Sequence, residues 1–335
     1  NFVAASDVNR DGLVDVLTAN IGSGDLSVLL NVGDGSFQTA EHFAVGLSPG
    51  SLSVADVNSD GLPDLISGNI GNLDVSVLLG NGDGSFQTVE QFEIDGTPNS
   101  ISVADVNGDG FLDVLTTNRS FGVSVLAGNG DGTFLSPQFY AAGDPFLGLS
   151  PLSIAVADVN RDGFPDIVTT NASDDASVLI GIGDGSFQNQ QRYPVGEGST
   201  SIAAVDVNED GITDILTANF DSDDVSVLIG NSDGTFRIQR RYSVGDGPAS
   251  VLAVDVNRDG LLDLVTANHE SHDLSMVLGS GNGLFGIHRT YDTDGPAIVA
   301  ATDVNGDDPQ ELVVVNFAVE SVFVLFFNND GFVER

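Results

Sequence analysis

The feature that most constrains the fold is a nine-residue string, Asp-Val-Asn-x-Asp-Gly-x-x-Asp, repeated along the whole chain of 335 residues. Its copies occupy residues 7–15, 56–64, 105–113, 158–166, 206–214 and 255–263, with a degraded copy, DVNGDDPQE, at 303–311. Successive copies begin 48 to 53 residues apart. A fixed period of this length is the signature of a repeat architecture. Seven units account for the entire sequence and leave no second domain.

Each unit reads as four short strands. In the second unit, residues 51–55 precede the string, residues 64–69 follow it and residues 75–79 alternate, before a GNGDGSF turn at 80–86 leads to an aromatic segment. Short β-branched and apolar runs between Gly, Asn and Asp turns favour strands. The sequence therefore predicts an all-β, seven-bladed β-propeller with four antiparallel strands per blade. A solenoid of stacked hairpins is the alternative, but an open stack needs polar capping units.

The expected blades form one domain, residues 1–335. Their approximate bounds are 1–47, 48–96, 97–148, 149–197, 198–246, 247–295 and 296–335. The last unit reaches Arg335 three residues after Phe332, where other units still have a fourth strand to come. We expect either a three-stranded last blade or one completed by residues beyond this sequence.

Charge excludes several partners. The chain has 49 Asp and Glu residues against ten basic residues, all Arg, for a net charge of −39. Such a surface repels nucleic-acid phosphates and anionic membranes. No apolar run approaches the ~20 residues of a membrane span. The absence of Cys removes disulfides, thiol catalysis and Cys-bound metals. We expect no nucleic-acid partner and no membrane insertion.

The string has the donor chemistry of a calcium loop. Asp at positions 1, 5 and 9, Asn at position 3 and the carbonyl of position 7 supply oxygen ligands, and Gly at position 6 allows the loop to curl. Oxygen ligands in a flexible loop favour Ca²⁺ over Mg²⁺. An EF-hand is excluded because position 12 is Thr, Ser or Val and strands follow. Asp, Asn and Gly are also ordinary turn formers, but seven clusters of carboxylates without cations would repel one another.

The expected calcium ligands occupy the same offsets in every unit. They are Asp7, Asn9, Asp11, Leu13, Asp15, Asp56, Asn58, Asp60, Leu62, Asp64, Asp105, Asn107, Asp109, Phe111, Asp113, Asp158, Asn160, Asp162, Phe164, Asp166, Asp206, Asn208, Asp210, Ile212, Asp214, Asp255, Asn257, Asp259, Leu261, Asp263, Asp303, Asn305, Asp307, Pro309 and Glu311. Six Ca²⁺ sites are expected. The seventh is degenerate because Asp308 replaces the Gly and Pro309 disfavours the turn conformation.

These motifs resemble the FG-GAP/VCBS repeat family, which includes the propeller of integrin α subunits. The resemblance covers the whole chain and rests on DxNxDGxxD and on the GNGDGSF turn, in the bacterial style of the repeat. It implies Ca²⁺ in the hairpin between the first two strands of each blade, extracellular or cell-surface placement, and adhesion or carbohydrate contact. The family also includes propellers fused to enzymes.

Residues that the repeat does not explain are candidates for function. The four Tyr residues align with Phe43 and Phe92 and are interpreted as packing residues, and Arg192 and Arg241 as protection for an outer sheet edge. The remaining residues fall on the face opposite the Asp-rich loops. The expected ligand contacts there are Arg119, Phe121, Phe146, Phe220, His269 and His272. The alternative is loop residues that have drifted without a task.

The sequence favours a non-catalytic, calcium-stabilised extracellular propeller that acts in adhesion or in carbohydrate or protein recognition. The expected partner is a glycan or an extracellular protein, and the chain is expected to be a monomer or part of a larger protein. One alternative is a polysaccharide lyase or glycosidase, which needs paired carboxylates or a base beside a cation. His269, His272 and Arg119, the residues free for a lyase, lie about three blades apart. Another alternative is an architectural unit of a surface protein.

Overall fold

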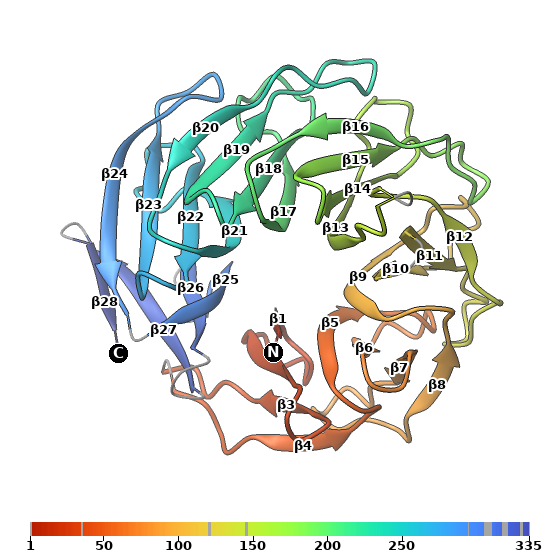
Figure 1. The fold of residues 1–335 in the computed structure, drawn as a ribbon. Helices are drawn as coiled ribbons and strands as arrows, with labels where there is room; N and C mark the ends of the chain where they lie inside the picture. Colours follow the sequence, from red (N-terminus) through yellow and green to blue (C-terminus); the bar gives the residue numbers. More distant parts are fainter. Residues whose placement is uncertain are drawn as a thin grey trace.

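Seven four-stranded antiparallel sheets surround a central axis (Figure 1). The computed structural model describes residues 2–34, 36–119, 122–144, 147–293, 295–304, 310–316, 321–328 and 331–334. In each sheet the strands follow chain order, with the first strand nearest the axis. This arrangement confirms the predicted seven-bladed propeller.

The strands group by blade in sequence order. Blade one contains β1 (Phe2–Ser6), β2 (Asp15–Asn20), β3 (Asp25–Leu29) and β4 (Glu41–Ala44); blade two β5 (Pro49–Ala55), β6 (Asp64–Asn69), β7 (Asp74–Leu78) and β8 (Glu90–Glu93); blade three β9 (Pro98–Ala104), β10 (Asp113–Asn118), β11 (Gly122–Leu126) and β12 (Gln138–Tyr140); blade four β13 (Pro151–Ala157), β14 (Asp166–Asn171), β15 (Asp175–Leu179) and β16 (Gln191–Pro194). Blade five contains β17 (Ser199–Val205), β18 (Asp214–Asn219), β19 (Asp224–Leu228) and β20 (Arg240–Ser243); blade six β21 (Pro248–Val254), β22 (Asp263–Asn268), β23 (Asp273–Gly279) and β24 (Phe285–Asp292); blade seven β25 (Pro296–Thr302), β26 (Glu311–Asn316), β27 (Ser321–Asn328) and β28 (Gly331–Glu334).

The hydrophobic core lies between blades. The second and third strands are buried on both faces because a blade packs against a neighbour on each side, as in β6 and β7. Each apolar cluster joins two blades; one combines Val159 and Val168 of blade four with Ile202 and Ile215 of blade five. Burial of such side chains is worth about 1.5–3 kcal/mol each, so a blade is stabilised mainly by its neighbours.

Aromatic pairs strengthen five of these junctions. Each pair joins a fourth-strand aromatic residue to a Phe of the next blade that lies in the third-to-fourth-strand turn or, for Phe285, at the start of the fourth strand. The rings are edge-to-face, with centroids 5.0 to 5.4 Å apart. Tyr193, for example, contacts Phe236. Such pairs contribute about 0.5–1.5 kcal/mol beyond area burial. The prediction that the Tyr residues pack is confirmed for Tyr140, Tyr193 and Tyr242.

A buried polar network joins the second and third strands of blades one to six. In blade five, Asn219 donates from Nδ2 to Asp224 Oδ1 (2.7 Å) and Ser226 Oγ (2.9 Å), and its Oδ1 accepts from Thr217 Oγ1 (2.9 Å). Gly196 of blade four donates its N–H to the same Ser226. An added Cβ at Gly196 would lie 2.5 Å from Asn219 Nδ2. Glycine is therefore required where the blade connection crosses the network.

Outer-strand cations complete the network in two blades. Arg192 Nε donates to Asp175 Oδ2 (2.9 Å), and Arg241 forms an ion pair with Asp224. The interpretation of these residues as edge protection missed this inward role. Blade two has no such pair, because Gln91 occupies the corresponding register position. Burial, reinforced by the nearby Glu93, raises the pKa of Asp74 there.

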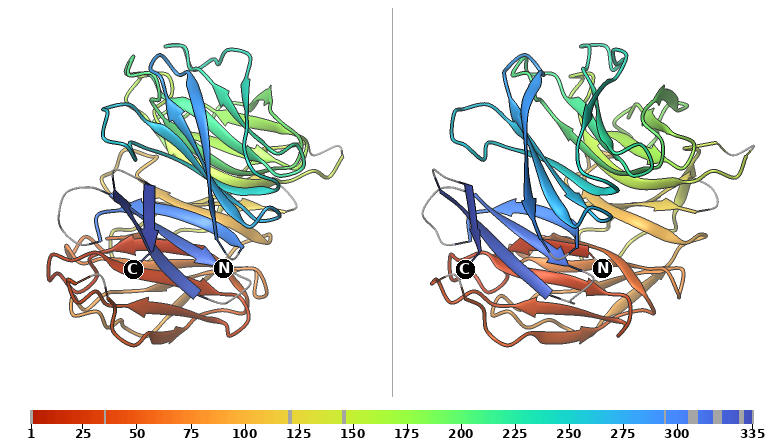
Figure 2. Two further views of the ribbon diagram at one scale, coloured as in Figure 1. Left: turned by 90° about the vertical axis from the view of Figure 1, so that its left-hand side faces the viewer. Right: turned by 60° about the vertical axis from the view of Figure 1, so that its left-hand side comes forward.

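The ring closes between blades seven and one, which lie side by side in Figure 2. Val3 and Val16 pack with Val304 and Val313, and Asn31 Nδ2 donates to the carbonyl of Val304 (2.7 Å). The last blade was expected to have three strands or to be completed by residues beyond this sequence. Instead the sequence itself supplies a short fourth strand, because β28 pairs with the half of β27 nearest the turn. Within the described ranges, no helix is long and apolar enough to cross a membrane.

The missing cation in blade two gives a stability test. Gln91→Arg should place a guanidinium beside Asp74 and raise the free energy of unfolding, by less than about 1 kcal/mol because such a side chain stays partly in solvent. Arg192→Gln should lower stability by a similar amount. Urea denaturation measures both changes. Gln87→Arg, at the other end of β7, adds the same charge and controls for the net charge of −39; an equal gain there would contradict the prediction.

Candidate functional site

The two faces of the ring differ in chemistry. The Asp-rich strings connect the first and second strands of each blade, and the DGS-type turns connect the third and fourth. Both lie on one face, which we call the Asp-loop face. The second-to-third-strand hairpins and the connections between blades lie on the opposite face, which we call the hairpin face. This is the division predicted from antiparallel strand order.

In the Asp-rich loops, the side chains of positions 1, 3 and 5 curl around their own backbone. In the first loop, Asp7 Oδ1 and Asn9 Oδ1 both accept from the N–H of Asp11, at 3.1 and 2.9 Å. Gly12 is left-handed, with φ 88°, as position 6 requires. Position 4 is left-handed too, with φ 61° at Arg10. Positions 1 and 3 are thus brought together, in an exposed loop that is held in an uncommon backbone conformation.

The Asp at position 9 faces the other way, into the sheet. Asp15 is fully buried; its Oδ2 accepts from the N–H of Val8 (3.0 Å) and its Oδ1 from the N–H of Asn31 (2.8 Å). The same pair of bonds recurs at Asp64, Asp113, Asp166, Asp214 and Asp263. This carboxylate ties the loop to the end of the third strand, a role the sequence analysis did not assign to it.

Burial and charge act on this carboxylate together. Burial, with smaller contributions from the carboxylates of positions 5 and 1, raises the pKa of Asp166, Asp214 and Asp263 to about 6, against the lowering effect of the two backbone hydrogen bonds. The same causes raise the pKa of Asp15 and Asp64. The charges of the loop are therefore close enough to destabilise one another.

The donor chemistry of the loops fits a hard cation, because every side-chain donor is oxygen and a cation would relieve this repulsion. As the side chains stand in the described part of the chain, no three acidic or His groups are gathered closely enough to hold a metal ion. Of the expected cage, positions 1 and 3 are half-buried and position 5 is exposed, and position 9 is buried behind them.

Two loops depart from the pattern. In the third, Asn107 Nδ2 contacts Asp113 Oδ1 at 3.5 Å, and Gly108 donates its N–H to Asp105. In the seventh, Asn305, Asp307 and Pro309 lie outside the described residues. Glu311 is buried there, and its Oε2 accepts from the N–H of Val304 (2.8 Å). Glu therefore takes the position of the buried Asp in blade seven.

The expected ligand contacts on the hairpin face do not form one cluster. Arg119 is exposed just after β10, and its Nε donates to Asn99 Oδ1 (3.0 Å). Phe220 is half-buried and lies against Gly247, where an added Cβ would be 3.1 Å from the ring. His269 and His272 are exposed in the hairpin between β22 and β23. Phe121 and Phe146 lie outside the described residues.

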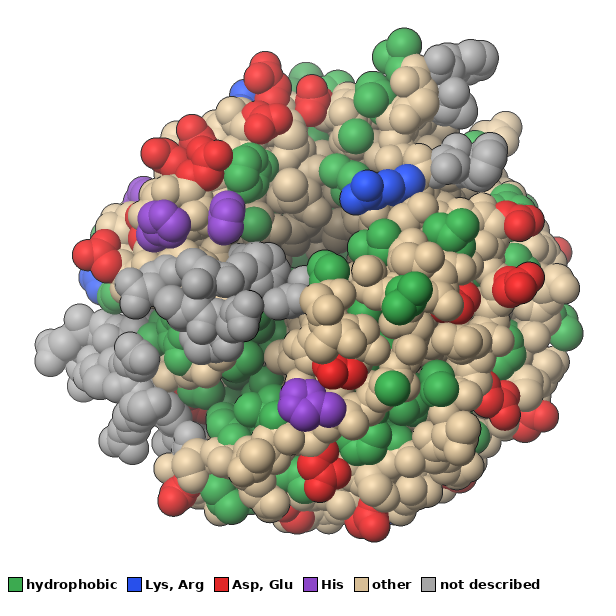
Figure 3. Space-filling model, turned by 60° about the horizontal axis from the view of Figure 1, so that its bottom comes forward, with side chains coloured by type: hydrophobic (Ala, Val, Ile, Leu, Met, Phe, Trp, Pro, Cys, Tyr) green, Lys and Arg blue, Asp and Glu red, His purple; other side chains and the backbone are tan. Residues whose placement is uncertain are grey.

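A cavity of about 410 Å³ occupies the centre of the ring, at the N-terminal ends of the first strands. Figure 3 shows a hollow at this centre with a basic side chain beside it. The cavity is lined by residues of blades one and three to seven, and Asn99, the partner of Arg119, is among them. None of the described residues that line it carries a charge. Phe220, His269 and His272 do not contribute.

The residues of this cavity were not among the predicted ligand contacts. One repeat position carries Phe2, Ser51, Ser100, Ser153, Ser201, Ser250 and Ile298, and all but Ser51 line the cavity. The signal was present as a break in the repeat: five units have Ser at this position, while the first and last have a large apolar residue. This position lies on the inner strands, whereas the predicted contacts all lie in loops.

The sequence profile of FG-GAP-like repeats matches six overlapping segments of the chain, residues 7–67, 56–116, 105–169, 158–217, 206–266 and 255–314. The chain belongs to the FG-GAP-like repeat family. Its repeats each begin at an Asp-rich string and run through the string of the next blade, so the matched unit spans a blade junction. No curated protein matches the sequence.

Solved structures share the fold of these FG-GAP-like repeats. The BP39L lectin from Burkholderia pseudomallei has a TM-score of 0.73 at 14% identity, covering 98% of this chain and 96% of that chain. A lectin from Agrocybe aegerita, described as recognising non-reducing terminal N-acetylglucosamine, has 0.61 at 20%, covering 87% and 80%. Virginiamycin B lyase from Staphylococcus aureus has 0.64 at 11%, covering 96% and 92%. At these identities the likeness shows the fold alone.

The buried Asp residues predict an inverted pH dependence in chelator. A raised carboxyl pKa means that the folded state binds protons more tightly than the unfolded chain between about pH 4 and 6. Stability should therefore rise as the pH falls from about 7 to 5, and be lost as the pH rises through 6. Thermal melts in chelator measure this. Asp214→Asn, which cannot titrate, should show a smaller rise; a steady fall in melting temperature with acid would contradict the prediction.

Proposed function

We propose that this protein is a non-catalytic carbohydrate-recognition propeller, stabilised by Ca²⁺ in its Asp-rich loops. The observation that carries the proposal is the uncharged central cavity. Its lining combines Ser and Thr hydroxyls with Ile, Val and Phe side chains, the mixture that small-molecule sites use to orient a ligand. A pocket of hydroxyls and apolar groups suits binding better than acid–base chemistry, which needs titratable groups beside the substrate.

The similarity to two lectins supports the proposal as an analogy of fold. Fold does not fix function, and a lyase shares the same architecture. The central cavity of this chain is the feature that favours recognition. An extracellular or cell-surface location and a role in adhesion follow from a glycan ligand and belong to the same proposal.

Calcium enters the proposal through the donor set. The half-buried Asp7 and Asn9 and the exposed Asp11, with their counterparts in five later loops, would hold the ion. The buried Asp15 and its counterparts would orient the loop from behind. When bound, Ca²⁺ would supply charge neutralisation and crosslink the loop. Hydrogen bonds from Arg161 to the carbonyls of Gly211 (Nε, 2.6 Å) and Asp210 (Nη2, 3.2 Å) join loop four to loop five, so stabilisation of one loop would reach its neighbour.

Calcium removal should lower stability. A chelator should reduce the melting temperature at neutral pH by several degrees or more, and millimolar Ca²⁺ should restore it, because weak extracellular sites have Kd values near ~10⁻⁴–10⁻³ M. Asp60→Asn/Asp109→Asn, which weakens two exposed loops, should reduce the shift. Mg²⁺ at the same concentration is the control. A melting temperature that does not respond to Ca²⁺ would contradict the calcium part of the proposal.

Carbohydrate recognition is tested on a glycan array. The folded protein, in millimolar Ca²⁺, should bind a restricted set of neutral glycans and leave sulfated and uronate-rich glycans unbound, because a net charge of −39 repels polyanions. Binding should weaken in chelator as the scaffold loosens. A blank array with protein of unchanged melting temperature would contradict carbohydrate recognition and favour a protein partner.

A further inference from the structure

We infer that the central cavity binds a single neutral sugar ring, with its apolar face against Phe2 and Ile298 and its hydroxyls toward the serines of blades three to six. This inference rests on the proposed carbohydrate recognition and adds to it the site, the orientation and the charge class of the ligand. It derives from one repeat position, whose residues line the cavity in every blade except blade two.

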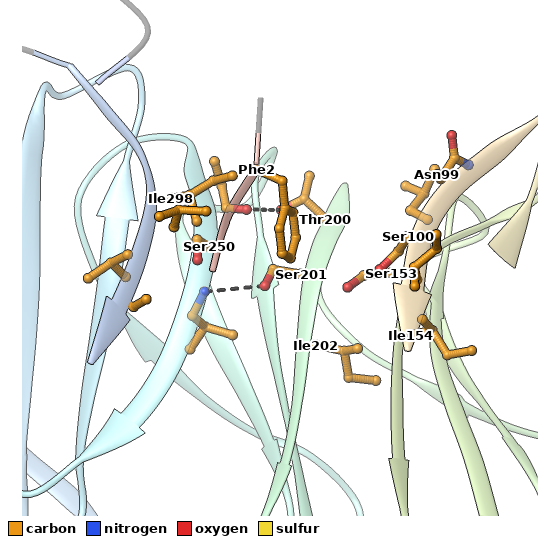
Figure 4. A pocket seen from close by; sticks show the side chains of 17 residues that line it. Phe2, Asn99, Ser100, Ser153, Ile154, Thr200, Ser201, Ile202, Ser250 and Ile298 are labelled. Atoms are coloured by element: carbon orange, nitrogen blue, oxygen red, sulfur yellow. Dashed lines mark hydrogen bonds between the residues drawn. The ribbon is translucent and has the colours of Figure 1, made fainter. Parts of the chain in front are cut away.

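The side chains at this repeat position are apolar on one side of the cavity and carry hydroxyls on the other. Figure 4 shows Phe2 and Ile298 toward one side of the cavity and Ser100 and Ser153 toward the other. Phe2 and Ile298 belong to blades one and seven, which adjoin where the ring closes. A seven-fold scaffold would present the same group on every side. This one instead presents hydroxyls along one arc and an aromatic and an aliphatic side chain along the other.

Some hydroxyls of the lining are hydrogen-bonded to protein groups and others are not. Ser201 Oγ accepts from the N–H of Val251 (3.3 Å), and Thr200 Oγ1 donates to the carbonyl of Pro248 (3.1 Å). Within the described part of the chain, the hydroxyls of Ser153 and Ser250 engage no protein group, although Ser250 is only 8% exposed. Neither hydroxyl is sealed from the cavity; both belong to its lining, where they are available to a molecule inside it. A polar ligand in the cavity would satisfy both groups.

The inner strand edges add further hydrogen-bonding groups. The first strand of each blade pairs only with the second strand of the same blade, so its other edge faces the axis. Unpaired N–H and C=O groups of such an edge need partners. Some of these edge groups are already paired with side chains of a neighbouring blade, such as the Val251 N–H with Ser201 and the Pro151 carbonyl with Asn99. A polyhydroxylated ring offers donors and acceptors to the edge groups that remain and to the two serines.

Size and charge define the ligand class. A volume of about 410 Å³ lies within the ~300–1,000 Å³ of small-molecule sites, near the lower end, which suits one sugar unit inserted from its chain terminus. No described lining residue is charged, so a carboxylate or an ammonium would be buried without a partner. Arg119 is exposed and adjoins the lining through its hydrogen bond to Asn99, so it would be available to a second sugar outside the cavity.

The experiment uses the methyl glycosides of glucose, galactose, mannose and N-acetylglucosamine, with methyl glucuronoside as the charged counterpart, and follows binding by ligand-observed NMR. At least one neutral glycoside should bind, at least about tenfold more tightly than the glucuronoside. Ser153→Ala/Ser250→Ala should weaken that glycoside by about tenfold or more. Ser51→Ala is the matched control, because Ser51 occupies the same repeat position but does not line the cavity.

A second variant keeps the test decisive if the double variant is unstable. Ala249→Phe fills the cavity without removing a hydroxyl and should abolish binding at unchanged melting temperature. The inference is overturned if no neutral glycoside binds, or if the best one binds both cavity variants as tightly as the wild type. Array hits that survive in these variants would overturn the cavity site and leave the proposed function intact, whereas a blank array would overturn both.

Discussion

The buried carboxylate at the end of each Asp-rich string is the interaction on which the rest of the structure depends. It is a charged group at the base of a loop that is otherwise in solvent, and it accepts one backbone N–H from that loop and one from the end of the third strand. Without it, the first-to-second-strand loop and the third strand would both have unpaired N–H groups inside the sheet. Glu311 can replace Asp in blade seven because its longer side chain still reaches the N–H of Val304. One side chain per blade therefore ties the loop between the first two strands to the end of the third strand.

The two faces of the ring are held by different buried polar groups. On the Asp-loop face the buried carboxylate anchors a charged, exposed loop whose geometry is dictated by side chains bonding to their own backbone. On the hairpin face, the Thr–Asn–Asp–Ser network does the corresponding work, and its Ser accepts an N–H from the preceding blade. Both devices are polar and buried, so they require defined geometry in a way that apolar packing does not. They leave the centre of the ring, where seven strand edges converge, as the place where polar groups are not fully paired.

The fold was predictable because the same pattern of strands and turns recurs in seven units of nearly constant length. Strand order, the two faces and the packing role of the Tyr residues followed from it. The orientation of the position 9 Asp did not, because a ligand-like spacing says nothing about which way a side chain turns once its neighbours are buried. Arg192 and Arg241 were placed on the correct strand, but their pairing with Asp175 and Asp224 depends on the cross-strand register. Phe220 was a reasonable candidate that the structure places against Gly247. The five serines at the repeat position of Ser100 can be recognised only when equivalent positions of the blades are compared. Their role as cavity lining could not be predicted, because it depends on the inner strands bordering a cavity.

The junction between the last and first blades differs from the others. In blades two to six a glycine stands at the position of Asn31, as in Gly80 and Gly230, and chain connectivity holds these blades to the ones before them. Here no peptide bond crosses, and Asn31 reaches over to Val304 instead. Phe2 and Ile298 flank this same seam, so a molecule resting on them would touch the beginning and the end of the propeller at once. Such a molecule would crosslink the first and last blades, so its binding would stabilise the closed ring. By the same linkage, variants that weaken the contact between blades seven and one would lower the affinity for the molecule.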